Sequence, residues 1–160
     1  TDEAGLGNDG FMMAASSNGG TGARPMKDGL SATTYPSGVK GTPVEIAESI
    51  TPLIFWRKEF REDSGGAGTT RGGLGQVIEV GSRIGKPFDL LAAYDRIDHP
   101  PRGRDGGKDG APGAVSLKSG KVLKGKGFQL IPPDDRLIVM TPGGGGIGDP
   151  ARRDRSALAR

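Results

Sequence analysis

The sequence contains no cysteine, one histidine and few aromatic residues, and each scarcity excludes a class of protein. Without cysteine the chain can form neither a disulfide framework nor a thiolate metal site, and this fits a cytoplasmic protein. Aromatic residues make up only 5%, which leaves few platforms on which bases could stack. No apolar run approaches the roughly 18–20 residues of a membrane-spanning helix. The N-terminus also lacks the basic-then-apolar pattern of a signal sequence.

Hydrophobic residues are scarce as well, at 33%, whereas glycine (30) and proline (12) reach the level typical of low-complexity disorder. The distribution argues against disorder. The glycines cluster between apolar runs, and the formal net charge of +3 is small for a disordered chain. We therefore expect a folded domain with long, tight loops and a thin core.

Short apolar runs separated by turn formers predict a mainly β, antiparallel domain with long Gly/Pro-rich loops. Strands are expected at residues 53–60, 74–84, 128–131 and 136–140, with a hairpin formed by 114–117 and 122–123. Residues 88–97 fit a strand or a short helix. Gly75 and Gly81 predict a bulge or bend in the second strand. Asp149 and Pro150 suit the N-cap and first position of a short C-terminal helix.

Composition divides the chain into three parts: an extended, loop-rich segment (1–43), a Gly-rich β domain (44–150) and the start of a truncated helix (151–160). The chain begins at Thr1 rather than at a methionine, and it stops within the predicted helix. Both ends predict a fragment of a larger α+β subunit.

Two glycine-rich loops are the strongest candidates for chemistry. One contains Ser64, Gly65 and Gly66 with Arg71 nearby, and the other contains Gly144, Gly145 and Asp149. Runs of glycine let neighbouring N–H groups converge on a phosphate or an oxyanion, and an arginine adds a fork of donors. The alternative is that these glycines only form sharp turns or let backbones pack closely. Neither loop is a Walker-type or dinucleotide motif, so any ATP site must lie elsewhere.

Other candidates for a catalytic or binding role are weaker. His99, with Asp95 and Asp98, could act as a ligand or base, but the simpler reading is a solvated loop histidine. Asp134 and Asp135 are expected to cap a turn. The Arg/Gly loop at 102–107 could bind RNA, although basic and acidic residues are interspersed along the chain. The sequence thus shows no metal site and no complete catalytic set.

Five phrases, in order, resemble the C-terminal part of the hydantoinase B / 5-oxoprolinase family: residues 19–29, 42–45, 63–68, 71–75 and 141–150. The resemblance implies a two-component, cytoplasmic enzyme of the N-methylhydantoinase or 5-oxoprolinase type. A hydantoinase A-type ATPase phosphorylates a cyclic amide, and the B-type subunit hydrolyses the activated ring. ATP would bind the partner and a divalent metal would bind residues upstream, so this segment would hold no cofactor. Ile147 departs from the family, where an aromatic residue is common at that position.

From this resemblance we expect the C-terminal segment of an ATP-dependent cyclic-amide hydrolase, inactive on its own. Its anion-binding residues would be the two glycine loops and Arg71. Two alternatives stay open: a carboxylase subunit of the acetone carboxylase type, and a non-catalytic Gly-rich module that docks partner subunits.

Overall fold

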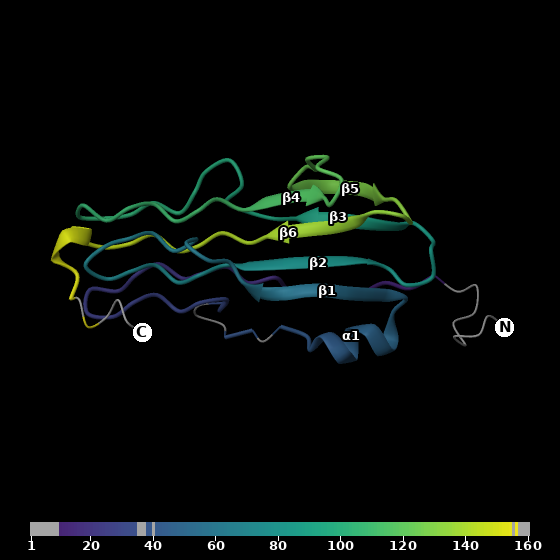
Figure 1. Ribbon diagram of the computed structural model, residues 1–160, viewed down its shortest axis with the longest axis horizontal. Coiled ribbons are helices and arrows are strands. Elements are labelled where there is room, and N and C mark those ends of the chain that lie inside the picture. The colour runs from purple at the N-terminus through teal and green to yellow at the C-terminus, as the bar shows by residue number, and fades with distance from the viewer. Residues whose placement is uncertain (1–9, 35–37, 40, 155, 157–160) are drawn as a thin grey trace.

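The computed structural model describes residues 10–34, 38–39, 41–154 and 156. The molecule is elongated, with a β sandwich at one end and a bundle of extended segments at the other (Figure 1). Its elements, in chain order, are α1 (Val44–Ile50), β1 (Leu53–Phe60), β2 (Gln76–Ser82), β3 (Phe88–Ala93), β4 (Ala114–Leu117), β5 (Lys126–Ile131), β6 (Arg136–Met140) and the 3-10 turn η1 (Pro150–Arg152). No helix in the described part of the chain is long and apolar enough to span a membrane.

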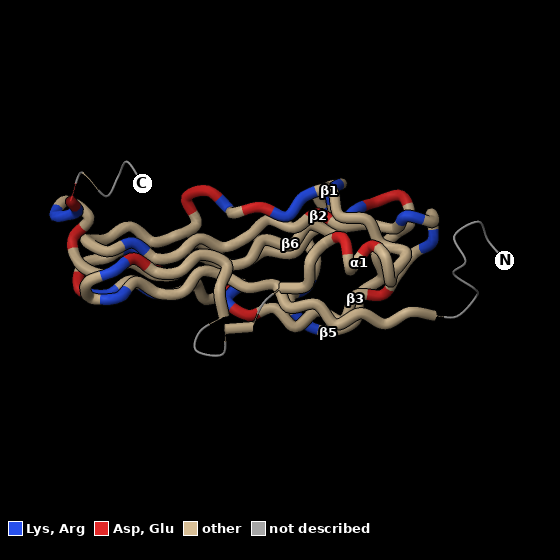
Figure 2. The backbone as a smooth tube through the Cα atoms, turned by 90° about the horizontal axis from the view of Figure 1, so that it is seen from below, with Lys and Arg blue, Asp and Glu red and all other residues tan. Residues whose placement is uncertain are grey.

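The sandwich consists of two antiparallel sheets in two layers. One sheet has the strand order β1-β2-β6-β4, and the other pairs β3 with β5. Figure 2 shows the two layers edge-on, with β1, β2 and β6 in one layer and β3 and β5 in the other. Because alternate residues of a strand point to opposite faces, one face of each sheet can turn toward the other sheet.

The core lies between these two inner faces. The four-stranded sheet contributes seven of the eight buried residues of the cluster, mostly as pairs two residues apart, such as Ile78 with Val80 and Leu137 with Val139. From the other layer, Ile131 of β5 is fully buried, and Phe88 and Leu90 of β3 pack against the cluster. The core is small, as the low hydrophobic content predicts.

The mainly antiparallel β fold is confirmed, and so is each predicted strand region. Residues 88–93 form a strand rather than a helix. The hairpin after β4 is present as a bridge between Ser116 and Val122. The bulge, however, lies in β1 between Phe55 and Arg57, so placing it at Gly75 or Gly81 was wrong. The bulge residue is Trp56, whose ring lies over Gly81, where a Cβ would come within 3.1 Å of it.

Two helical segments differ from the prediction. The helix α1, seven residues long and following Pro43, was not predicted, because it buries only Ala47 and therefore has little apolar periodicity. The predicted C-terminal helix begins as expected, with Asp149 as N-cap and Pro150 in the first turn, but it is a single 3-10 turn. Most of the remaining predicted helix lies outside the described residues.

The other end of the molecule is a bundle of extended segments without ladder-type pairing. The four glycines at 143–146 lie at its centre, contacted by segments near residues 20–22, 64–67, 72–73, 102–103 and 107–110. Lateral hydrogen bonds join the segments, including Gly144 N to Gly73 O and Gly146 N to Lys108 O, both 2.9 Å. These segments correspond to the wavy, parallel traces in Figure 1.

The contacts of the central segment repeat every three residues. Gly143 faces the carbonyl of Ser64, Gly144 that of Thr21 and Gly145 that of Arg102, and Gly146 then returns to the first neighbour at Ala67. Three residues per turn and purely lateral hydrogen bonds are the properties of polyproline II helices, which tolerate only glycine where they pack most closely. A Cβ on any of these four glycines would lie under 3.0 Å from backbone atoms.

Candidate functional site

The bundle brings together the two glycine-rich loops that the sequence analysis selected. Gly66 donates its N–H to the carbonyl of Gly144 at 2.8 Å, which joins the first loop directly to the second. Thr70 and Ile147 exchange two further backbone hydrogen bonds, of 3.1 and 3.0 Å. The two loops therefore form one structural unit, although about 80 residues separate them in the sequence.

Ser64 is at the buried end of this unit, with 1% of its surface exposed. Its hydroxyl donates to the carbonyl of Arg61 at 2.7 Å and accepts from the N–H of Gly75 at 2.9 Å. These two bonds fix the turn between β1 and the first glycine loop. In this arrangement the hydroxyl faces protein backbone rather than an open site.

The glycines of the two loops face backbone at short range. A Cβ on Gly65 would overlap the carbonyl of Gly72, and one on Gly66 would overlap that of Lys108. The N–H groups of Gly66 and Gly144 already donate to carbonyl oxygens. Close packing of backbones thus accounts for these glycines, whereas anion binding by the loops stays a prediction.

Charged side chains are exposed to solvent at the end of the bundle. The backbone N–H of Arg71 donates to Oδ1 of Asp28 at 2.7 Å, and the Arg71 side chain is exposed. The carboxylate of Asp149 accepts from the N–H of Ala151, and its carbonyl accepts from Thr69 Oγ1 at 3.0 Å. Of the predicted site residues, Arg71 and Asp149 both have exposed charged side chains at this end, and Arg71 is the basic one.

Asp28, which was not among the predicted site residues, connects three segments at this end of the bundle. Arg153 contacts both carboxylate oxygens of Asp28, at 2.9 and 2.7 Å, with 11% of the Arg153 side chain exposed. The hydrogen bond from Arg153 lowers the pKa of Asp28 to about 2, the backbone bond from Arg71 adds to this, and partial burial opposes it. In the sequence, Asp28 stood out only as part of the segment at 27–29, which belongs to the family resemblance.

Exposed basic side chains lie on several segments of the bundle and in η1. They are Arg24, Lys27, Arg71, Arg102, Arg104, Lys108 and Arg152. In Figure 2 blue segments cluster at the end opposite the sandwich, interspersed with red ones. Arg24 also donates to the carbonyl of Asp28 at 2.7 Å. Such an end can attract an anion, with nearby acidic residues moderating the field.

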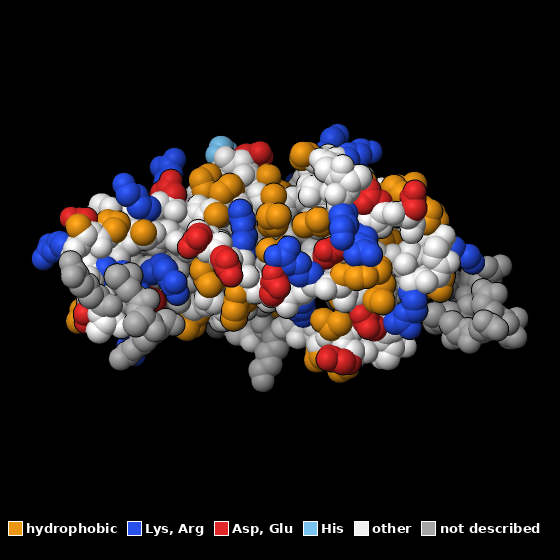
Figure 3. Space-filling model, in the orientation of Figure 1, with side chains coloured by type: hydrophobic (Ala, Val, Ile, Leu, Met, Phe, Trp, Pro, Cys, Tyr) orange, Lys and Arg blue, Asp and Glu red, His pale blue; other side chains and the backbone are white. Residues whose placement is uncertain are grey.

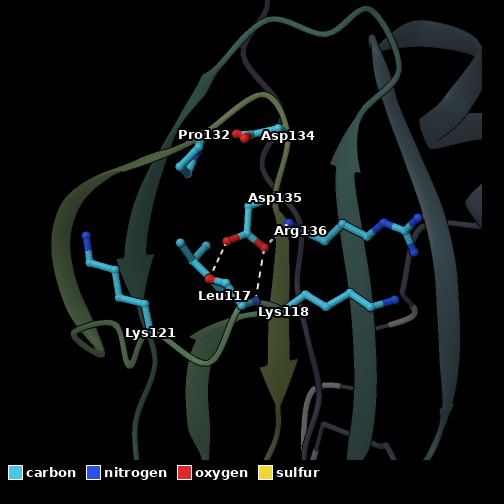
Figure 4. Close-up of a pocket in the computed structure, with 8 residues that line it drawn as sticks. Leu117, Lys118, Lys121, Pro132, Asp134, Asp135 and Arg136 are labelled. Atoms are coloured by element: carbon cyan, nitrogen blue, oxygen red, sulfur yellow. Dashed lines mark hydrogen bonds between the residues drawn. The ribbon is translucent and has the colours of Figure 1, made fainter.

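Two hollows lie in the sandwich half, away from the end of the bundle. The larger, about 670 Å³, is lined by Lys118, Ser119, Lys121, Asp134, Asp135 and Arg136, among others. Figure 4 shows Asp135 bonded to the neighbouring turn at residues 118–119 rather than directed at open space. It accepts from Ser119 Oγ at 2.5 Å and from the Arg136 N–H at 2.8 Å. The hydrogen bond from the Ser119 side chain is the largest influence on the pKa of Asp135 and lowers it. Asp135 also accepts from the Ser119 backbone N–H at 3.2 Å, so it caps a turn, as predicted for this residue.

The smaller hollow, about 230 Å³, lies where the sandwich meets the bundle. Ser17, Tyr94, Asp95, Arg96 and Thr141 are among its lining residues. Burial raises the pKa of Tyr94, and a hydrogen bond from Lys126 lowers that of Asp95. His99 is exposed. Among the described residues no three His, Cys, Asp or Glu side chains are grouped as a metal site would require.

Comparison with known proteins identifies the family. The family model described as hydantoinase B/oxoprolinase matches residues 1–150. The chain is 36% identical over 148 residues to 5-oxoprolinase 1 of Arabidopsis thaliana, covering 89% of this chain and 12% of that protein. Similarity to the caprolactamase of Pseudomonas jessenii appears in sequence and in structure. Its subunit beta is 29% identical over 157 residues, covering 89% of this chain and 26% of the subunit.

The solved structures place the fold in longer chains. The crystal structure of the ATP-dependent caprolactamase superposes with a TM-score of 0.72 at 24% identity, over 88% of this chain and 26% of that one. The nucleotide-free structure of acetone carboxylase superposes with a TM-score of 0.61 at 20% identity, over 89% and 24%. Both likenesses concern the fold alone. On the match to the family model, the chain belongs to the hydantoinase B/oxoprolinase family.

Proposed function

We propose that this chain is a C-terminal segment of the B-type subunit of an ATP-dependent cyclic-amide hydrolase. The observation that carries the proposal is the family match over residues 1–150, together with the similarity to a 5-oxoprolinase. 5-Oxoproline and caprolactam, after which the relatives are named, are both ring amides. Because the chain spans 12% of that 5-oxoprolinase, the activity belongs to a larger protein.

The chemistry explains why such an enzyme would use ATP. An amide carbonyl is a poor electrophile, and phosphoryl transfer to its oxygen activates the ring carbon toward water. Water then opens the C–N bond, and ADP and phosphate are released. In our proposal a hydantoinase A-type ATPase partner, in the cytoplasm, carries out the phosphoryl transfer. A divalent metal that assists the hydrolysis would be held by residues outside this chain.

Within this chain, the proposed contribution is an electrostatic one at the end of the bundle. The activated amide is anionic, so cations fixed near it stabilise the transition state. The anion-binding proposal includes Ser64, Gly65, Gly66, Arg71, Gly144, Gly145 and Asp149. In this proposal the serine and the glycines have a structural role, because they contact protein backbone. Arg71 is exposed and faces the anion.

Turnover of the complete enzyme tests the activity. The longer protein that carries this chain, combined with its ATPase partner, should open 5-oxoproline or a related lactam only when ATP is present. Acetone and bicarbonate should not be consumed. Bicarbonate-dependent consumption of acetone without lactam opening would replace the hydrolase by the carboxylase. No turnover of either kind would favour a docking module.

The variant Arg71→Ala tests the electrostatic role. We expect it to lower kcat/KM of the complete enzyme about 10- to 100-fold without changing the melting temperature. Arg57→Ala is the matched control, because Arg57 is an exposed arginine on β1, paired with Glu59 in the sandwich half. Equal activity of the two variants would remove Arg71 from the proposal.

A further inference from the structure

The outer face of the β3–β5 sheet carries a group of exposed, large apolar side chains. Leu91 of β3 is 62% exposed, and Phe128 and Leu130 of β5 are 78% and 61% exposed. Leu91 and Phe128 are direct cross-strand partners, and Leu130 follows Phe128 by two residues. The three side chains therefore point to the same side, away from the core that Ile131 fills. We call these three residues the β3–β5 patch.

The other outer face of the sandwich differs in character. On the four-stranded sheet Glu79 accepts from Arg136 at 2.8 Å and from Lys118 at 2.9 Å. The guanidinium of Arg136 lies 3.7 Å from the ring centroid of Trp56 and covers it. In Figure 3, which has the four-stranded sheet toward the viewer, basic and acidic side chains are interspersed over the strands. On that face charged side chains lie over the strands and one of them stacks on Trp56, whereas the β3–β5 patch consists of apolar side chains alone.

The strands of the patch also have free edges. Among the described residues, β3 and β5 form a sheet with each other alone. Around the apolar centre lie Asp89, opposite Leu130, and Lys126, which is paired with Asp95 at 2.6 Å. An apolar centre with a charged rim is typical of a protein interface, and an uncovered apolar sheet edge favours aggregation. A cover for this face is therefore expected in the working protein.

The lengths of the relatives point to the cover. The same fold occupies 26% of the caprolactamase chain onto which it superposes, so there it accompanies about three times its own length of polypeptide. We infer that the β3–β5 patch docks onto the remaining part of the B-type subunit, with Phe128 at the centre of the contact. This inference rests on the proposed function, because it assumes that the chain works within such a subunit.

Thiol labelling tests the inference directly, because the chain has no cysteine of its own. Phe128→Cys and Leu91→Cys would each be labelled in the 160-residue chain and in the complete subunit. The labelled peptides would be quantified by mass spectrometry. Both substitutions remove exposed side chains, and circular dichroism of the variants checks that they fold. Met26→Cys is the matched control, because Met26 is 88% exposed at the opposite end, in the turn between Arg24 and Lys27.

If the patch is an interface within the subunit, labelling at residues 91 and 128 slows at least tenfold in the complete subunit, and labelling at residue 26 is unchanged. Equal rates in the two contexts would overturn the inference. Slowing in the short chain that grows with its concentration would assign the patch to a second copy, and slowing only after the ATPase is added would assign it to that partner. Both outcomes also overturn it. Labelling is independent of turnover, so an inactive enzyme with a protected patch would contradict the proposed function alone.

Discussion

The two ends of this molecule are stabilised by different groups, the sandwich by its side chains and the bundle by its backbone. In the sandwich, side chains such as Ile131 and Val139 fill the space between two sheets, and burial of apolar surface stabilises the fold. In the bundle, backbone lies against backbone, and hydrogen bonds between segments replace side-chain packing. A chain with 33% hydrophobic residues can therefore form both parts, because the bundle needs few apolar side chains.

The comparison also predicts opposite responses to mutation. A sandwich tolerates a smaller side chain at the cost of a cavity, because its neighbours relax partly. The central glycines of the bundle cannot accommodate a larger side chain, because the atoms around them belong to neighbouring backbone segments. Adding a single methyl group there displaces a whole segment. Three measurements of stability, from the largest expected effect to the smallest, can sharpen or break this contrast.

Gly144→Ala should have the largest effect. The new methyl would overlap the carbonyl of Thr21, so the central segment must leave its neighbours, and we expect a loss of more than about 4 kcal/mol in the free energy of unfolding by urea. Gly10→Ala meets open space and should change stability by less than about 0.5 kcal/mol. Gly120→Ala also meets open space but has a φ of +96°, so it isolates backbone strain, about 1 kcal/mol. If Gly144→Ala were as stable as Gly10→Ala, the bundle described above would be wrong.

Ile131→Ala should cost less, about 2–5 kcal/mol, the range for a large core residue reduced to alanine. Ile131 is fully buried between the sheets, whereas Ile46 on α1 is 52% exposed. Ile46→Ala is therefore the control and should remain within about 0.5 kcal/mol of wild type. Thermal unfolding followed by circular dichroism would measure both. A loss at residue 131 larger than that at Gly144 would reverse the contrast between the two ends.

The Asp28–Arg153 pair at the end of the bundle should have the smallest effect. Asp28 is charged in the folded state down to a pKa of about 2, against 3.8 normally, so its contribution is fully present above about pH 4 and is lost as the pH falls toward 2. Because 38% of the Asp28 side chain is exposed, solvent screening reduces this contribution to about 1 kcal/mol.

Comparing wild type with Asp28→Asn by urea unfolding between pH 7 and pH 2 would measure this contribution. The two should differ by about 1 kcal/mol at neutral pH and converge at the acid end. In an Arg153→Met background the effect of Asp28→Asn should shrink, as expected for coupled partners. A difference that is constant over the whole pH range would show that the ion pair does not hold the segments together.

The candidate site could be predicted only in part. The sequence shows the glycine clusters at 64–68 and 143–146. It also shows that the phrases containing them follow the order found in the family. That they lie against each other is not visible, because contacts between residues about 80 positions apart leave no local pattern. The anion hypothesis and the close-packing alternative were both compatible with runs of glycine. The Asp28–Arg153 pair escaped notice for a similar reason, since 125 positions separate its members.

The sequence by itself determined the β class, the strand positions, the turn at Asp135 and the family. These depend on alternation of apolar residues, on local capping and on short phrases in a fixed order, all of which are local properties. Only the tertiary structure decided the role of the four central glycines, the place of the bulge in β1 and the exposure of the β3–β5 patch. Each of these depends on which distant segment lies opposite a residue, and the absence of a side chain gives no sign of what fills its place.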